Sequence, residues 1–460
     1  MDDYRSEKSK ALARLAAGDA HGAFAGFRWQ LEYPGKVEPR DFADALTTLA
    51  QIAARITGPD WAAHVHRAAR RPNDVEALFD CGYQLIEQSL HGIAATVLMR
   101  AHKLDPAAEG LLSELSIALE GAGMNVEACR VLRDAPELLR GSATCRYLFA
   151  FNTLMTGDIE GARREIDLVR VKVGDENAAI MVGNVREMLA RADAIRDVTP
   201  LNDTDLRGWH AVVTGSLLLH LSPYGFDDRG EGGGEGGGER GRGGGMRGRY
   251  AFVQDSESRV LEGINRLAAA LDAWAKRPPR VLTLSGRESE TIAIAAGEVL
   301  GLAIERFPLH KHVEGLVVAY DLAQQPTELL DVLVQHRSNR LLWSHAAQWT
   351  SEGPFASDAT TYLYQINHTP WQAGRLRVNP DAQQQEETPE VEGTPRALAD
   401  AVLDAGCDLE SMSDLDALSN LAKAMRRLPS DHPAAFGAFR QQGPRSRQRV
   451  DSPVKSARFL

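Results

Sequence analysis

The sequence predicts a multi-domain protein: an all-α solenoid of helical repeats, an α/β domain with a mainly parallel sheet, and a helical and disordered C-terminal tail. Three observations predict this fold class. Residues 75–169 repeat with a period of 34, helices alternate with short apolar strands between residues 255 and 349, and the chain becomes polar after residue 376. We therefore expect domains at 1–195 and 205–375, followed by a segment at 376–460.

Composition places the chain among ordinary globular proteins, with 43% hydrophobic and 25% charged residues. The net charge of −11 argues against general affinity for phosphate backbones or anionic lipid, so nucleic acid and membranes are not expected partners. The first five residues are acidic and polar and lack the features of a secretory signal. Because the apolar runs are also shorter than the ~18–20 residues that span a bilayer, we expect a cytoplasmic protein.

The helical repeats are visible as equivalent residues 34 positions apart, and Ala94, Ala128 and Ala162 keep this spacing without a gap. The segment 75–106 resembles the tetratricopeptide repeat family. The family has signature positions where the two helices of a hairpin approach closely or where a helix ends. In this segment those positions hold Leu78, Gly82, Ala94, Ala101 and Pro106, and the following copies hold Ala128 and Ala162. The resemblance covers residues 5–170.

Two earlier repeats are expected before residue 75. Gly18-Asp19 followed by Ala23 matches Gly157-Asp158 followed by Ala162, which predicts one repeat near residues 5–36 and a divergent one over 40–71. The resemblance implies a solenoid of stacked hairpins whose exposed groove binds a protein or peptide. The alternative is that the array serves only as packing support for the C-terminal region.

A Gly-, Arg- and Glu-rich insertion interrupts the α/β domain at residues 229–249. This composition cannot bury apolar surface, so the segment is predicted to be disordered. Residues 209–222 before it and 250–253 after it are apolar like strands, which suggests an expanded hairpin tip. Glutamates beside its arginines, and the lack of aromatic residues for base stacking, favour a flexible linker over an RNA-binding segment.

The α/β domain is expected to begin with a helix that Ser256 caps and that Pro278-Pro279 ends. The expected strands lie at 280–284, 303–307, 315–320 and 340–344, and the expected helices at 290–300 and 329–336. This alternation predicts a mainly parallel sheet covered on both faces.

Polar residues follow two of these strands, at the edge where sheets of this class bind ligands. Ser285, Gly286, Arg287 and Ser289 form a glycine-containing turn at a helix N-terminus, which could hold a small anion, and Asp321 follows the strand 315–320. The alternative is ordinary loop and helix-cap chemistry.

The arrangement over 255–349 also resembles, in degenerate form, the type I phosphoribosyltransferases. This resemblance implies a diphosphate at the turn and a ribose hydroxyl on Asp321. Tyr320 replaces an acid and Pro326 replaces a flexible glycine of the family's ribose-binding stretch, so a non-catalytic relative is expected.

The C-terminal segment is predicted to hold a linker at 378–393, two short helices and a basic disordered tail beyond Pro429. Elsewhere, no Ser-His-Asp or nucleophile-elbow signature occurs, and His310 and His312 lack further ligands at metal spacing. We therefore expect no catalytic residue, metal or cofactor. The sequence predicts a protein-interaction adaptor or scaffold; the alternative is a phosphoribosyltransferase-like or nucleotide-handling enzyme that uses the 285–289 turn and Asp321.

Overall fold

The computed structural model forms two compact units, of residues 1–185 and 186–459. It describes residues 2–56, 59–172, 174–221, 249–350, 353–379, 384–407, 413–448 and 451–454. The Gly-rich insertion lies outside these residues except for Arg249, as do the last residues of the chain. No helix in the described ranges combines the length and the apolar character needed to cross a bilayer.

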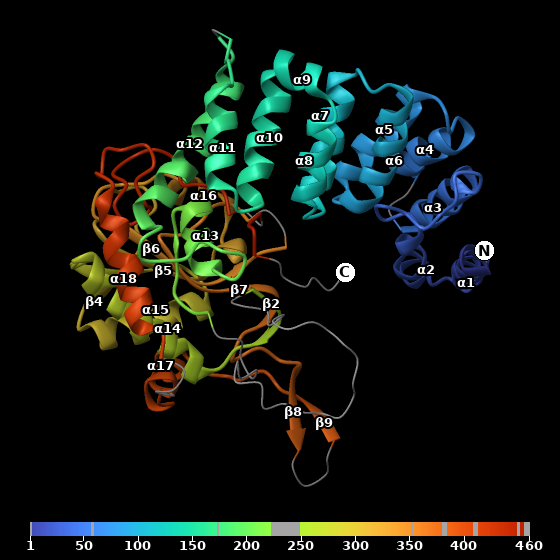
Figure 1. Ribbon diagram of the computed structural model, residues 1–460. Helices are drawn as coiled ribbons and strands as arrows, with labels where there is room; N and C mark the ends of the chain where they lie inside the picture. Colours follow the sequence, from blue (N-terminus) through green and yellow to red (C-terminus); the bar gives the residue numbers. More distant parts are fainter. Residues whose placement is uncertain are drawn as a thin grey trace. The chain divides into compact units, whose positions relative to one another are not determined.

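The first unit is helical, and its helices follow one another in chain order (Figure 1). Neighbouring helices pack in pairs: α1 with α2, α3 with α4, α5 with α6, α7 with α8, and α10 with α11. The helices are α1 (Asp2–Ala16), α2 (Ala20–Phe27), α3 (Phe42–Ile56), α4 (Pro59–Arg70), α5 (Val75–Glu87), α6 (His91–Leu104), α7 (Glu109–Gly121), α8 (Asn125–Arg133), α9 (Pro136–Gly141), α10 (Ala143–Met155) and α11 (Ile159–Asp167), with α12 (Glu176–Ile195) reaching into the second unit.

The 34-residue period has a packing basis in this unit. Ala94, Ala128 and Ala162 are all fully buried. At Gly82 a Cβ atom would lie 2.4 Å from the Cγ atom of Leu98, so only glycine lets α5 approach α6 this closely. The helix starts repeat as well, because Asp19 and Asp158 each accept a hydrogen bond from a backbone amide three residues later, at 2.8 Å.

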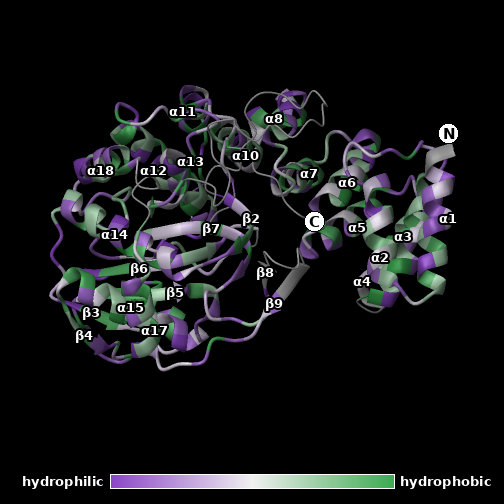
Figure 2. Ribbon diagram, turned by 90° about the horizontal axis from the view of Figure 1, so that it is seen from below, coloured by the Kyte–Doolittle hydropathy of each residue, from purple (hydrophilic) through white to green (hydrophobic). Residues whose placement is uncertain are grey.

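The second unit is built on a seven-stranded sheet in which all strand pairs are parallel, as the sequence predicted. Figure 2 shows β7, β6, β5, β3 and β4 lying in that order. The strands are β1 (Leu217–Leu218), β2 (Arg249–Gln254), β3 (Arg280–Thr283), β4 (Ala303–Arg306), β5 (Gly315–Asp321), β6 (Arg340–Gln348) and β7 (Ala359–His368).

The two strands beside the insertion do not form the expected hairpin. Both pair with β7 in parallel, β1 opposite Ala359 and β2 from Leu363 onward. They are therefore two pieces of one edge strand that the insertion interrupts. Residues 209–214 of the expected strand at 209–222 are helical instead, because they belong to α13 (Leu206–Thr214). Gly215, with a φ of 75°, ends this helix before β1 begins.

Helices cover both faces of the sheet. On one face α15 (Arg287–Leu300) packs on β3 and β5, and α14 (Glu257–Trp274) packs on β7. Outside them lie α17 (Pro395–Asp404) and α18 (Leu415–Ala424). On the other face α16 (Thr327–Leu333) buries Leu329 and Leu333 against Val317 and Leu342 of the central strands. The core of the second unit therefore occupies both faces of the sheet.

The chain after residue 375 differs from the prediction of a linker and a disordered tail. Strands β8 (Arg375–Asn379) and β9 (Gln384–Thr388) pair in an antiparallel arrangement that begins just before the expected linker at 378–393 and extends into it. Residues 430–448 pack into the second unit, where Phe436 is fully buried and Arg445 pairs with Asp358. Apolar residues at 434–439 explain this outcome, because burying them offsets the cost of ordering the backbone.

Candidate functional site

The turn at 285–289 joins β3 to α15, as the sequence predicted. Gly286 is the N-cap residue of α15 and has a φ of 114°, a conformation that side-chain-bearing residues rarely adopt. Ser289 is buried, and its hydroxyl accepts hydrogen bonds from the Tyr320 amide at 3.1 Å and the Gln325 side chain at 3.4 Å. Ser289 therefore ties α15 to the carboxyl end of β5.

The structure gives Arg287 and Asp321 different surroundings. The Arg287 guanidinium donates to Glu390 at 2.9 Å and to the carbonyl of Trp371 at 3.4 Å. Asp321 is 2% exposed, and its carboxylate accepts the Ala323 amide at 2.9 Å and the Tyr364 hydroxyl. Burial raises the pKa of Asp321, and these two hydrogen bonds only partly oppose that shift. Ser289 and Asp321 thus meet at one strand end, but each is bonded within the protein.

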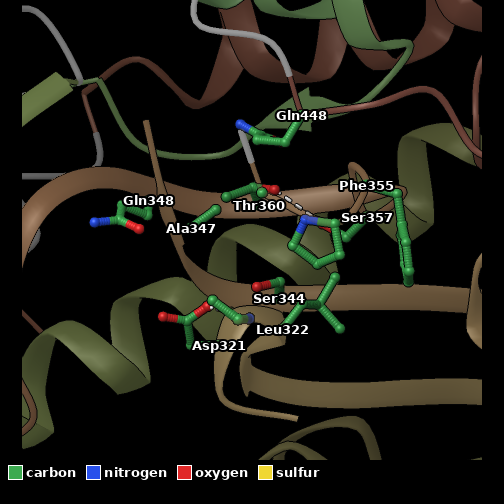
Figure 3. A pocket seen from close by; sticks show the side chains of 12 residues that line it. Asp321, Leu322, Ser344, Ala347, Gln348, Phe355, Ser357, Thr360 and Gln448 are labelled. Carbon is green, nitrogen blue, oxygen red and sulfur yellow. Dashed lines mark hydrogen bonds between the residues drawn. The ribbon is translucent and has the colours of Figure 1, made fainter. Parts of the chain in front are cut away.

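Asp321 also borders a cavity of about 20 Å³ between β5, β6 and β7. Figure 3 shows Asp321 and Ser344 on one side of this cavity and Thr360 and Gln448 on the other. The Ser357 hydroxyl lies 2.8 Å from that of Thr360. Because a single water needs a cavity of roughly this size, the space suits one water molecule and is too small for a substrate.

A buried polar network, which the sequence did not reveal, joins the carboxyl ends of three strands. Asp255 follows β2 and is fully buried; its carboxylate lies 3.0 Å from His345 Nε2 on β6 and accepts the Tyr320 hydroxyl at 2.8 Å. Burial alone would raise the pKa of Asp255, but the His345 imidazole and the hydrogen bonds hold it below its usual value. Asp255 is therefore an ionised acid inside the protein.

The side chains of Asp255, Tyr320, His345 and Tyr362 are all fully buried, and only Asn367 at the margin of the network is partly exposed. Tyr320 OH also accepts from the Asn367 side chain at 3.2 Å, and Tyr362 OH donates to Asn367 at 3.0 Å. The other ring nitrogen of His345 has no hydrogen-bond partner among the described residues and faces Gly263, where a Cβ atom would lie 3.0 Å away. With no room for a ligand on that side, the network acts as a brace between strands.

A second buried network holds charged groups near the end of β1. His220 Nε2 lies 3.1 Å from Glu262, which also accepts the Arg266 Nε at 2.8 Å. Arg266 and Arg207 both pair with Asp414, at 2.8 and 2.5 Å. Burial would raise the pKa of Glu262, but His220 and Arg266 hold it below its usual value. Through Asp414, these contacts hold the segment that follows α17 against Arg207 of α13 and Arg266 of α14.

The helical unit carries an exposed apolar face of a different kind. Phe79, Tyr83 and Ile86 recur at helical spacing along α5, and Tyr83 is 42% exposed. Ile117 on α7 is 34 positions after Tyr83, and α7 contacts α5. Phe79, Ile86 and Ile117 are half-buried. These four residues are called the α5–α7 face below.

Acidic residues border the α5–α7 face. Glu87 is exposed at the end of α5, and Glu114 is half-buried on α7. Burial and the nearby Glu87 charge raise the pKa of Glu114. A cationic group from outside would relieve this repulsion.

No family model matches the chain, and no curated protein is significantly similar to it. Among the described residues, no three His, Cys, Asp or Glu side chains gather as a metal ion would require.

Proposed function

We propose that the protein is an adaptor whose N-terminal unit is a tetratricopeptide-type solenoid that binds a partner protein through the α5–α7 face. The observation that carries the proposal is the exposed aromatic ring of Tyr83 between half-buried Phe79 and Ile86. Aromatic side chains at the centre of an interface supply much of its binding energy. An apolar strip along one helix suits a partner helix or extended segment.

The charges beside the face define the partner's chemistry. Glu87 and Glu114 place two carboxylates next to the apolar strip. A partner segment with two or three apolar side chains and a neighbouring Lys or Arg would complement both features.

The α/β unit is proposed to be a non-catalytic module. Asp321 and Ser289, the residues that a nucleotide-handling enzyme would use at this edge, are hydrogen-bonded to Tyr364 and to the Tyr320 amide. A ligand that used them would have to replace these internal bonds. No observation favours the enzyme over the adaptor.

Affinity capture on the full-length chain, followed by titration of the purified partner, tests the proposal. Tyr83→Asp should weaken the partner's Kd about tenfold or more, since removing an interface anchor has effects of this size. The matched control is Val126→Asp, which places the same charge on α8 at a side chain that is 72% exposed.

Both variants alter exposed residues, so far-UV circular dichroism should match the wild type. The adaptor proposal fails if no stoichiometric partner is captured. A partner that both variants bind equally well would leave the adaptor standing but exclude the α5–α7 face.

A further inference from the structure

The amino edge of the sheet in the second unit contains a cleft of about 620 Å³. It opens where β5 and β6 begin, beside the end of α14 and residues 437–441. This edge is opposite to the 285–289 turn, because the strands are parallel and that turn follows the carboxyl end of β3. Binding sites for small molecules commonly have volumes of about 300–1,000 Å³, so the cleft is large enough for a metabolite.

The cleft is lined by more cations than anions. Five basic side chains border it, against one carboxylate, Glu314, whose Oε1 atom accepts the Asn339 amide at 3.0 Å. The basic residues are Lys276, Arg277, Arg337, Arg340 and Arg440. In a protein with a net charge of −11, this local positive surplus is a specific feature of the cleft.

Three of these cations lack a strong carboxylate partner in the described part of the chain. Lys276 makes no ion pair with a described residue, and its ammonium lies 5.3 Å from the centre of the Phe439 ring. Arg337 is exposed and likewise makes no ion pair within the described ranges. Arg340 is 5% exposed and donates to the carbonyls of Val332 and Gln335, while its Nε has no acceptor. A buried donor without an acceptor costs free energy. A ligand that accepts a hydrogen bond from Arg340 Nε would remove this cost.

Repulsion among the basic groups supports the same conclusion. Burial and the neighbouring Arg445 charge lower the pKa of Arg340 to about 10. Burial and the charges of Arg445, Arg440 and Arg340 also lower the pKa of His336 far below its usual value. Burial is the larger cause of both shifts, and the positive neighbours lower the two pKa values further; Asp358, which pairs with Arg445, partly opposes the shift of Arg340.

We propose that this cleft binds a small organic phosphate. Lys276 and Arg337 would contact the phosphate oxygens, with charge-assisted bonds of the kind that ammonium and guanidinium groups form with phosphate. Arg440, which lies 3.4 Å from Glu187, would add a third positive charge beside them. The Phe439 ring and Leu341 would contact the less polar part of the ligand. The site is separate from the α5–α7 face and does not depend on the adaptor function.

Isothermal titration calorimetry on the full-length protein at low ionic strength tests this site, with pyrophosphate and ADP as probes. The test variant is Lys276→Gln with Arg337→Gln, which neutralises two cations that make no ion pair among the described residues. The control is Arg306→Gln with Lys311→Gln, which removes the same charge from exposed positions at the last residue of β4 and in the loop that follows it.

We expect the wild type and the control to bind both probes with submillimolar Kd and the test variant to bind at least tenfold more weakly, because charge-assisted bonds are strong. Binding should also weaken as salt is added. The proposal is overturned if neither probe binds with a Kd below about 10 mM. It is also overturned if the control loses binding while the test variant keeps it, or if a single-stranded oligonucleotide binds more tightly than ADP. Matched thermal unfolding of the two variants shows that each remains folded.

Discussion

The two units bury different kinds of side chain. Among the described residues, the helical unit buries one charged side chain, Arg28, and fills its interior with Ala, Leu and other apolar residues at repeated positions. The α/β unit buries ten charged side chains: Arg191, Arg207, Arg249, Asp255, Glu262, Arg266, Asp321, Arg340, Asp358 and Arg445.

This difference predicts two kinds of response to mutation. In an array of helical pairs, most contacts join helices that are close in sequence, and stability is close to a sum of local terms. In the α/β unit a buried charge depends on partners far away in the chain, and removing one partner leaves the others uncompensated. Five of the seven tryptophans belong to the α/β unit, so tryptophan fluorescence reports mainly on that unit and circular dichroism on both.

The largest effect is expected at Arg266, which is fully buried and pairs with Glu262 and Asp414. Arg266→Met should lower the free energy of unfolding of the α/β unit by about 3–5 kcal/mol, because the buried Glu262 and the half-buried Asp414 lose a partner. Urea unfolding followed by tryptophan fluorescence measures this loss.

The control for Arg266 is Arg396→Met, which removes an exposed arginine that pairs with Glu298 and Asp400. Exposed ion pairs contribute little, so the unfolding midpoint should hardly move. Equal losses in the two variants would contradict the idea that buried pairing distinguishes the α/β unit.

A second, smaller effect is expected at Asp255. Asp255→Asn should cost about 2 kcal/mol near neutral pH, since hydrogen bonds to a charged group are lost. The pKa of Asp255 in the folded protein is below its ordinary value of 3.8, so its stabilisation is present above pH 3.8 and is lost as the pH falls through the folded-state value. Unfolding measured between neutral and acid pH should therefore show the two proteins converging at the acid end.

In the helical unit the matched pair is Gly82 and Gly110. Gly82→Ala should cost about 1–3 kcal/mol, because the new methyl group overlaps Leu98. At Gly110 on α7 no atom lies within 4 Å of the Cβ position, so Gly110→Ala should be neutral or stabilising by up to about 1 kcal/mol. The loss should appear in the circular dichroism transition while tryptophan fluorescence changes little. Equal shifts of the two transitions would mean that the units unfold together.

Local patterns explain why parts of the fold could be predicted. The predicted strand at 280–284 and the helix at 290–300 match β3 and α15 closely, because apolar periodicity, Gly286 and Gly301 act within a few residues of one another. The buried positions of Ala94, Ala128 and Ala162 follow from the repeat in the same way.

Features that depend on distant residues could not be predicted. Asp255 and His345 are 90 positions apart, and nothing near either one in the sequence indicates that they pair. The cleft at the amino edge likewise combines residues near 276, 340 and 440. The expected hairpin at the insertion failed for a related reason, since strand direction depends on the partner strand, and the partner here is β7, more than a hundred residues later.

The smallest effect is expected at the insertion between β1 and β2. The His220 amide donates to Thr361, and Arg249 lies opposite Leu363, so the two pieces of the edge strand end and restart two residues apart along β7. That separation is only about 7 Å, which a short loop spans. Replacing residues 229–248 by four Gly and Ser residues should leave the free energy of unfolding of the α/β unit within about 1 kcal/mol of the wild type, because loop closure changes by about 0.6 kcal/mol per doubling of length. Tryptophan fluorescence in urea measures the change. A loss of several kcal/mol would mean that the insertion packs on the unit and contributes to its stability, whereas an unchanged midpoint would show that the edge strand is held in place without the insertion.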